Sequence, residues 1–300
     1  MELYEMFREN FPFIVREEKT ALNILSNENN IIIDKRDNNG KLIAVSVINQ
    51  NTILMLCVNK EYRNQGIGTE LLKKSEEIIK QNGYNEIIVG VGFDYLMPGI
   101  PTCIKPYEQE LEKDNIYSNV NNYAVQFFIK YGYFHSWNDA NCFDMRVNLS
   151  KQDLGENSIG DKINGITYRW ANMEDLVKIK ECTDDAYSDF TQYYMNEELY
   201  KEKSNQRVLI ATNNNKVLGT LIVSIEIEGK NLGSVGCTAV SHEHRGKHIA
   251  SNLVVLGTKY LQSIGLQNGY LGYTYSGLDK LYGYAGYKIC VYYYMAKKEI

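Results

Sequence analysis

The chain has 300 residues, more than one hydrophobic core usually supports, so we expect two domains. A net charge of -5 and a pI near 5.6 argue against a nucleic-acid partner and mildly favour cationic small molecules such as amines. No apolar run is long enough to cross a membrane and the acidic first residues do not resemble a signal peptide, so we expect a cytoplasmic protein.

The first half begins with one or two helices within residues 1–30. Two strands are expected next, at Ile31 to Asp34 and at Leu42 to Ile48. Between them lies Asn38-Asn39-Gly40, a strong hairpin signal because asparagine and glycine tolerate the positive φ angles of tight turns. A third strand is predicted at Ile53 to Val58, a short apolar run with β-branched members.

A glycine-rich turn follows this third strand. Arg63 to Gly68 has the spacing R-x-x-G-x-G, and apolar residues then recur at helical spacing from Leu71 to Ile79. The start of a helix has unpaired N–H groups and the positive end of the peptide dipoles, and glycine lets an anion approach the backbone. The sequence therefore predicts a pyrophosphate-binding loop, with an arginine adding positive charge.

The rest of the first half contains a strand, a loop, a helix and a last strand. The strand is expected at Glu86 to Val91, and residues 95–101, with two prolines and a glycine, are expected to form only a loop. A helix is predicted from Asn121 to Gly132 and a strand from Cys142 to Leu149. The polar residues 151–164 are interpreted as a linker between domains at 1–150 and 165–300.

The second half repeats the order of the first. Placing Arg245 on Arg63 aligns Val240 to Ala250 with Val58 to Gly68, and valine, glutamate, arginine and isoleucine coincide. A later motif, aromatic-x-x-x-G-Y, also occurs in both halves, with its glycine at 132 in the first half and at 286 in the second. The chain is therefore expected to contain two copies of one fold.

The cysteines and histidines do not predict a metal site. Six cysteines lie far apart without a C-x-x-C pair, so we expect reduced and mostly buried thiols. His242 and His244 flank Glu243 but fall in the turn before the second loop, where a solvated surface is the expected environment.

These motifs together resemble the GNAT superfamily of acyl-CoA N-acyltransferases, over nearly the whole chain as two tandem copies. The resemblance implies a mixed α/β fold, with two GNAT-like domains that each have a mostly antiparallel sheet, splayed central parallel strands and flanking helices. It implies acetyl-CoA as the cofactor, lying between the splayed strands. The tandem arrangement is similar to that of mycothiol synthase, an analogy of fold only.

The resemblance also assigns residues to the cofactor. In the first copy the strand edge for pantetheine would be Leu56 and Val58, and the pyrophosphate loop would be Arg63, Asn64, Gln65, Gly66, Ile67, Gly68 and Thr69. In the second copy the matching residues are Val240, Arg245, Gly246, Lys247, His248, Ile249 and Ala250. The family most often has glycine where His248 stands. A side chain there either weakens phosphate binding or, when protonated, donates to the phosphate.

The catalytic groups implied by the resemblance are divided between the halves. Family members commonly use the tyrosine of Y-x-x-x-G-F/Y as the acid that protonates the coenzyme A thiolate. Tyr282 matches that position, with packing as the alternative role, whereas Phe128 occupies it in the first copy. Asp94 is the candidate base of the first half, with loop capping as its alternative, and Tyr273 or Tyr275 takes the matching region of the second.

The expected function is transfer of an acetyl group from acetyl-CoA to the amine of a small-molecule acceptor. The alternative is a non-catalytic protein that binds or senses coenzyme A and has vestigial active sites. The sequence leaves open the acceptor, the catalytic domain and the oligomeric state.

Overall fold

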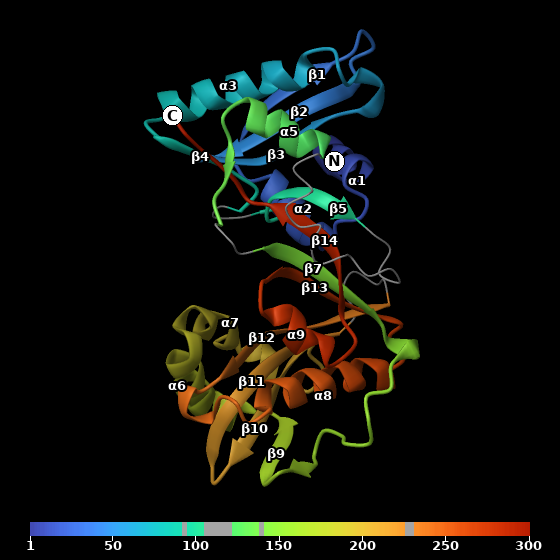
Figure 1. Cartoon of the computed structure of the whole chain (residues 1–300), viewed down its shortest axis with the longest axis vertical. Helices are drawn as coiled ribbons and strands as arrows, with labels where there is room; N and C mark the ends of the chain where they lie inside the picture. Colours follow the sequence, from blue (N-terminus) through green and yellow to red (C-terminus); the bar gives the residue numbers. More distant parts are fainter. Residues whose placement is uncertain (92–94, 105–121, 138–140, 226–230) are drawn as a thin grey trace. The chain divides into compact units, whose positions relative to one another are not determined.

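The computed structural model describes residues 1–91, 95–104, 122–137, 141–225 and 231–300, which form two compact units (Figure 1). Unit 1 holds the described residues within 1–104, 122–143 and 291–300, and unit 2 holds those within 144–290. The chain therefore builds most of unit 1, then unit 2, and returns to unit 1 at its end.

Unit 1 contains a six-stranded sheet with the order β1-β2-β3-β4-β15-β6. Its strands are β1 (Ile31–Arg36), β2 (Leu42–Asn49), β3 (Thr52–Val58), β4 (Glu86–Val89), β6 (Phe134–His135) and β15 (Ala296–Glu299). Its helices are α1 (Glu2–Asn10), α2 (Glu18–Leu25), α3 (Ile67–Gln81) and α5 (Tyr123–Lys130).

The parallel strands β3 and β4 are paired only where they begin. Thr52 pairs with Ile88 and Ile53 with Val89. Strand β3 then continues to Val58, while no further pair with β4 forms among the described residues. The two strands diverge, which confirms the splayed arrangement and leaves one edge of β3 open to a ligand.

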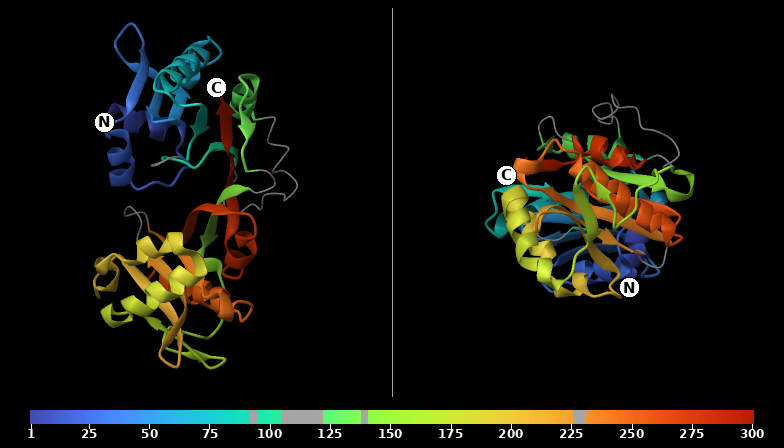
Figure 2. Two further views of the ribbon diagram at one scale, coloured as in Figure 1. Left: turned by 90° about the vertical axis from the view of Figure 1, so that its left-hand side faces the viewer. Right: turned by 90° about the horizontal axis from the view of Figure 1, so that it is seen from below.

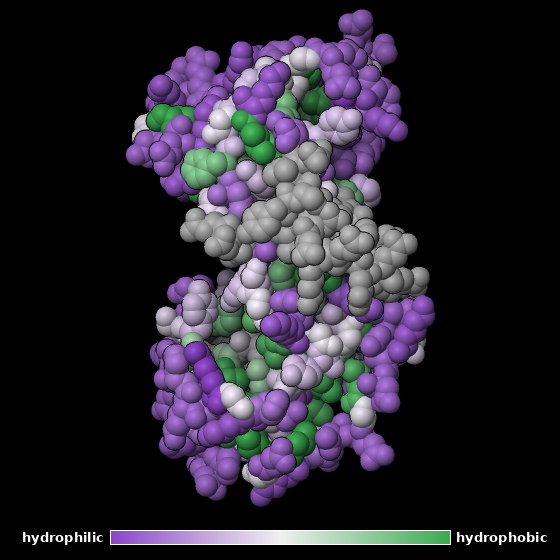
Figure 3. Space-filling view, viewed as in Figure 1, coloured by the Kyte–Doolittle hydropathy of each residue, from purple (hydrophilic) through white to green (hydrophobic). Residues whose placement is uncertain are grey.

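Helix α3 covers the sheet of unit 1 with an apolar stripe. Leu72 and Ile79 are fully buried and pack in one cluster with Ile48, Ile53 and Ile87 of the strands. The opposite face of α3 carries lysines and glutamates, and the region around it is hydrophilic in the space-filling view (Figure 3). Packing of this stripe fixes the start of α3 beside the end of β3.

The last strand of unit 1 comes from the C-terminus of the chain. In β15, Lys297 pairs with Ile88 of β4 on one side and with Phe134 of β6 on the other. Figure 2 shows this red strand within the sheet of unit 1. A division of the chain at residues 151–164 would therefore separate Val291–Ile300 from the unit to which it belongs.

One prediction about unit 1 was wrong. Residues 95–101 were expected to form only a loop, but Ile100 and Pro101 begin strand β5 (Ile100–Ile104). Pro101 lies opposite Tyr293 of β14 (Lys288–Tyr294), and β5 is the edge strand of its sheet. Proline lacks an N–H donor, and an edge strand tolerates this because one of its sides has no neighbour.

Unit 2 contains strands β13 to β8 of a second sheet, whose order is β5-β14-β7-β13-β12-β11-β10-β9-β8; β5, the start of β7 and the end of β14 belong to unit 1. Its other strands are β7 (Cys142–Asn148), β8 (Lys162–Ile163), β9 (Ile166–Trp170), β10 (Gln206–Asn213), β11 (Lys216–Ser224), β12 (Leu232–Val240) and β13 (Asn268–Tyr275). Its helices are α6 (Leu176–Tyr187), α7 (Thr191–Tyr194), α8 (Ile249–Ser263) and α9 (Leu278–Gly283).

The parallel pair of unit 2 repeats that of unit 1. Leu232 pairs with Asn268 and Gly233 with Gly269, and β12 then continues to Val240. The mixed α/β fold with splayed parallel strands in each unit is confirmed. Strand β7, which was predicted as the last strand of the first half, lies between β13 and β14.

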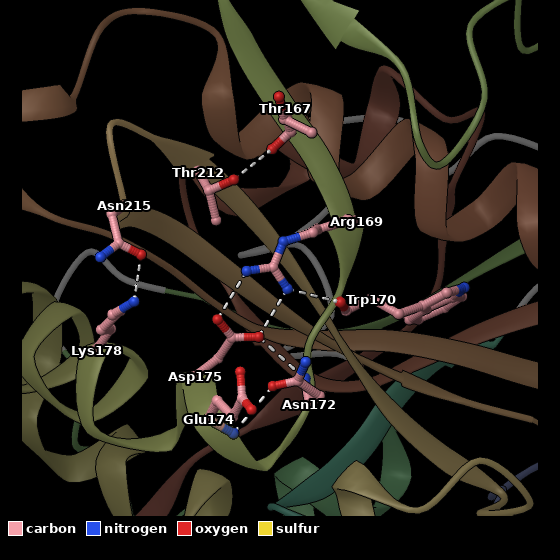
Figure 4. A network of polar contacts seen from close by, with 9 residues as sticks. All are labelled: Thr167, Arg169, Trp170, Asn172, Glu174, Asp175, Lys178, Thr212 and Asn215. Atoms are coloured by element: carbon pink, nitrogen blue, oxygen red, sulfur yellow. Dashed lines mark hydrogen bonds and ion pairs between the residues drawn. The ribbon is translucent and has the colours of Figure 1, made fainter.

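A partly buried ion pair fixes the start of α6 to β9 (Figure 4). Arg169 donates from its two terminal nitrogens to the two carboxylate oxygens of Asp175, each at 2.7 Å. The Asp175 side chain also accepts from the N–H of Asn172, whose side chain in turn accepts from the N–H of Glu174. This capping box orders the turn between strand and helix.

In the described part of the chain, no helix combines the length and the apolar character needed to span a membrane. The five described cysteines are free thiols, and all but Cys237 are buried. Burial raises the pKa of Cys57, which lines the cleft described below, to about 12. This thiol is therefore protonated at neutral pH and is a poor nucleophile.

Candidate functional site

The loop between β3 and α3 presents backbone N–H groups at the start of a helix. Asn64 and Gly66 have positive φ angles of 62° and 83°, and these left-handed residues turn the chain into α3. The first helical hydrogen bond runs from the N–H of Glu70 to the carbonyl of Gly66 at 3.0 Å. The N–H groups of the preceding helical turn therefore have no partner within the helix and suit an anion.

Gly68 brings this helix start close to its neighbours. A Cβ atom at this position would lie 3.7 Å from Val58 of β3 and 3.7 Å from Phe127 of α5. A small side chain would thus touch both walls without a clash. The loop is closely packed on its inner side and open on the other, where Gly66 has no heavy atom within 4 Å of an added Cβ.

Arg63 is exposed and lines the cleft described below, but its guanidinium is held by neighbouring residues. Its Nε atom donates to the carbonyl of Val58 at 2.9 Å, and one terminal nitrogen donates to the side-chain oxygen of Asn10 at 3.1 Å. The guanidinium therefore joins the loop to the end of β3 and to α1. The role predicted from sequence, extra charge near a phosphate, is accompanied by a positioning role that spacing did not indicate.

A cleft of about 700 Å³ opens beside the loop. Its walls are β3 from Ile53 to Val58, the end of β4, the loop itself, helix α5, and the segment that follows α1. Residues in these walls that were not predicted from sequence include Asn10, Phe11, Phe13, Tyr62, Met97, Tyr123 and Phe127. The volume and the mainly apolar walls suit a small organic ligand with a polar end.

A bulge in β3 lies where the two strands diverge. Val47 of β2 pairs with Met55, but the next residue, Ile48, pairs with Ile53, so Leu54 is an extra residue in β3. A bulge leaves an extra residue unpaired in the ladder. Because Leu54 also lines the cleft, the bulge places unpaired backbone groups beside a bound ligand.

Thr69, the predicted hydroxyl donor, already has a partner. Its Oγ1 atom lies 2.9 Å from the hydroxyl of Tyr131, at the end of α5. This contact ties the first turn of α3 to α5 across the cleft. Tyr131 follows Phe128 by less than one helical turn. The aromatic motif therefore contributes the Tyr131 hydroxyl at the loop and the Phe128 ring in the core.

Phe128, at the position of the family's catalytic tyrosine, provides no acid in the cleft of unit 1. Phe128 is 5% exposed and lies edge-on to Phe127 and Tyr133, with ring centroids 5.3 and 5.1 Å apart. It lines the cleft but has no ionisable group. Asp94, the candidate base, lies outside the described residues.

The loop of unit 2 has the same backbone shape as that of unit 1. Gly246 and His248 have φ angles of 75° and 60°, in the places of Asn64 and Gly66, and α8 begins after His248. Arg245 repeats the contacts of Arg63: its Nε lies 3.4 Å from the carbonyl of Val240, and a terminal nitrogen donates to the carbonyl of Ala186 at 2.9 Å.

The cleft at this second loop is smaller, with a volume of about 330 Å³. It is lined by the loop, by the first turn of α8 and by α9, and Val240 is the one residue of β12 that contributes. The described residues of β13 do not line it. In unit 1, by contrast, six residues of β3 line the cleft. The strand edge therefore lines the cleft along β3 in unit 1, whereas in unit 2 only the last residue of β12 lines it.

The side chain of Tyr282 lies against β12, beside Thr238. It is 6% exposed, and burial raises the pKa of its hydroxyl to about 12 although the nearby Thr238 hydroxyl opposes the change. The neighbouring Tyr194 is fully buried and donates to the carbonyl of Cys237, a residue with a positive φ of 50°. A bulge of β12 lies here too, because Thr220 pairs with Ala239 but Ile222 with Gly236.

Sequence reasoning missed the contribution of α1 and of the segment after it. Asn10 is 53 positions from Arg63 in the chain, and no motif links them. One or two helices were expected within residues 1–30, but the contact of the first with the loop depends on how α1 packs against β3.

Comparisons with known proteins agree with this geometry. The sequence profile described as the acetyltransferase (GNAT) family matches residues 1–96 and 170–282. No curated protein matches the chain in a sequence search.

Solved structures share the fold at low sequence identity. A GCN5-related glucosamine N-acetyltransferase region of a fungal multi-domain GH3 β-N-acetylglucosaminidase has a TM-score of 0.71 and 18% identity, over 98% of this chain and 36% of that one. The present chain thus spans about a third of that protein. A tandem GNAT protein from the clavulanic acid biosynthesis pathway has a TM-score of 0.65 and 12% identity, over 99% and 94% of the two chains. A GCN5-related N-acetyltransferase from Sphaerobacter thermophilus has a TM-score of 0.59 and 18% identity, over 89% and 80%.

Proposed function

The chain belongs to the acetyltransferase (GNAT) family, and we propose that it transfers an acetyl group from acetyl-CoA to the amine of a small-molecule acceptor, with the cofactor in unit 1. The observation that carries this proposal is the cleft of about 700 Å³, which joins a helix-start loop to the open edge of β3. We place the activity in the cytoplasm, on the evidence of free thiols among the described cysteines.

The residues of unit 1 fit the three parts of the cofactor. The N–H groups at the start of α3 would hold the pyrophosphate, with Arg63 keeping the loop in place. The open edge of β3 beyond Ile53 would pair with the pantetheine amides, in the manner of an added strand. The bulge at Leu54 would turn backbone N–H groups toward the thioester carbonyl, where negative charge develops.

The reaction forms a bond between the amine nitrogen and the acetyl carbon and breaks the bond between that carbon and sulfur. The amine loses a proton and the thiolate gains one. Phe128 cannot supply that proton, so it comes from another group of the cleft, from solvent or from the attacking amine. A positioned acid typically contributes about 10²- to 10⁴-fold, so we expect a slow but measurable turnover.

Unit 2 has the opposite combination. Tyr282 is protonated at neutral pH, as an acid must be, but it does not line the smaller cleft, to which β12 contributes only Val240. We therefore propose that Tyr282 of α9 packs against β12 and that the second loop, with His248, does not hold a complete cofactor.

Titration calorimetry with acetyl-CoA tests the cofactor site, and release of coenzyme A thiol in the presence of a panel of small amines tests the transfer. We expect one acetyl-CoA per chain and thiol release that depends on the amine. Two equivalent sites would show that unit 2 also accepts the cofactor, contrary to the proposal.

The alternative function is a protein that binds or senses coenzyme A without transferring the acetyl group. The observation in its favour is Phe128, which removes the usual proton donor from the unit with the open cleft. Tight acetyl-CoA binding with no thiol release for any amine would favour this alternative.

A further inference from the structure

Unit 2 carries a surface group of aromatic side chains that the proposed transfer does not use. The group comprises Tyr187, Phe190, Tyr193 and Tyr275 and is called the aromatic cluster. The rings of Tyr187 and Phe190 have centroids 4.8 Å apart, and those of Phe190 and Tyr193 6.4 Å, both with edge-on geometry. Tyr275, at the end of β13, is close enough to Tyr187 to affect its ionisation.

The rings are anchored below and open above. Phe190 packs against the buried core of unit 2 formed around Ile179 and Tyr194, which fixes the middle of the cluster. Tyr187, Tyr193 and Tyr275 are 52%, 54% and 43% exposed. Large aromatic side chains gathered at a surface without a covering element usually mark a site of interaction.

The charge beside the cluster is negative. Asp189 lies in the turn between Tyr187 and Phe190, and hydrogen bonding to its carboxylate raises the pKa of the Tyr187 hydroxyl. The nearby carboxylates of Asp184 and Asp185 have basic partners, Lys180 and His242. Within the described part of the chain Asp189 has no such partner, so its charge is available to a ligand.

We propose that the aromatic cluster and Asp189 form a binding site for an organic ammonium ion. The faces of tyrosine rings attract cations through their quadrupole, and organic ammonium groups are the ligands that clustered aromatic rings bind in this way. An anionic ligand would be repelled by Asp189. A neutral sugar would stack on the rings but would gain little from the carboxylate.

The test uses the full-length chain saturated with coenzyme A, so that the unit 1 cleft is filled. Choline is the cationic probe, and neohexyl alcohol, its uncharged carbon isostere, is the matched probe. Binding is followed by saturation-transfer NMR and calorimetry. The variants are Tyr187→Leu, Tyr193→Leu and Asp189→Asn. The control is Tyr284→Leu, a tyrosine of unit 2 that is 63% exposed but has no ring partner among the described residues.

We expect choline to bind saturably and more tightly than neohexyl alcohol, and each cluster variant to weaken choline binding about fivefold. The control should bind choline like the parent, and unchanged thermal unfolding should show that every variant is folded. Methyl glucoside serves as a neutral sugar probe. Equal binding of choline and neohexyl alcohol, choline binding that is unchanged in the cluster variants, or tighter binding of methyl glucoside than of choline would each overturn the proposal. The absence of saturable choline binding would also overturn it.

Discussion

The guanidinium of Arg63 donates to the side-chain oxygen of Asn10, so a residue of α1 holds the loop that precedes α3. Removing this arginine should loosen the loop before any phosphate contact is considered. We expect Arg63→Ala to weaken acetyl-CoA binding about 30-fold, because two hydrogen bonds of about 1 kcal/mol each are lost. Calorimetric titration measures the change.

The control for this prediction is the equivalent arginine of unit 2. Arg245 makes matching contacts with Val240 and Ala186, but beside a smaller cleft. Arg245→Ala should therefore leave acetyl-CoA affinity unchanged. An affinity loss in Arg245→Ala as large as that in Arg63→Ala would locate the cofactor in unit 2.

His248 occupies a left-handed backbone conformation that costs a non-glycine residue about 1 kcal/mol. We expect His248→Gly to keep the loop and to raise the free energy of unfolding by up to that amount. Gly66→Ala, in the same conformation in unit 1, should lower the free energy of unfolding. Chemical unfolding of both variants checks the pair, and a stability loss in His248→Gly would mean that the imidazole itself stabilises the loop.

The loops were predictable from sequence because they depend on local rules. Glycine spacing, a strand before and an amphipathic helix after are all visible within the residues from Ile53 to Ile79. The return of β15 to unit 1 and the position of β7 beside β13 were not predictable, because strands next to one another in the chain usually share a sheet. Likewise, the smaller cleft of unit 2 depends on how Leu281 and Tyr284 pack beside the loop, which no motif records.

The position of β15 predicts how the chain responds to truncation. A fragment of residues 1–150 would lack Val291–Ile300 and leave β4 and β6 without the strand that joins them. We expect this fragment to be unfolded or aggregated, since an unpaired inner edge exposes backbone groups and core residues. Fusing residues 291–300 to the end of the fragment through a flexible linker should restore folding, as measured by thermal unfolding and by the dispersion of amide chemical shifts in NMR spectra. A stable, monomeric fragment without the fusion would contradict the prediction.

The ion pair of Asp175 predicts a dependence of stability on pH. Burial alone would raise the pKa of Asp175, but hydrogen bonds from Arg169 and from the backbone of Asn172 outweigh it, and the pKa is lowered. A lowered pKa in the folded state stabilises the protein above the unfolded value of about 4, and this stability is lost as the pH falls through the folded pKa. Asp175→Asn should therefore cost about 2 kcal/mol at neutral pH and progressively less in acid.

Urea unfolding of Asp175→Asn and the parent at several pH values measures this difference. Glu174→Gln is the matched control, because Glu174 lies on the same cap and is exposed. The control should follow the parent at every pH. A stability difference for Asp175→Asn that does not shrink in acid would show that the amide disturbs packing rather than charge.

Phe128 and Tyr282 occupy the same place in the two aromatic motifs. Adding a hydroxyl group at position 128 and removing the one at position 282 tests which unit performs the acetyl transfer. Phe128→Tyr would place a hydroxyl on a side chain that lines the open cleft, so we expect a higher kcat with unchanged acetyl-CoA affinity. Tyr282→Phe should leave kcat unchanged, because Tyr282 is buried and does not line the smaller cleft. Steady-state kinetics with one amine acceptor measures both. If Tyr282→Phe lowers kcat while Phe128→Tyr has no effect, the acid belongs to unit 2, and that unit must open its cleft during turnover.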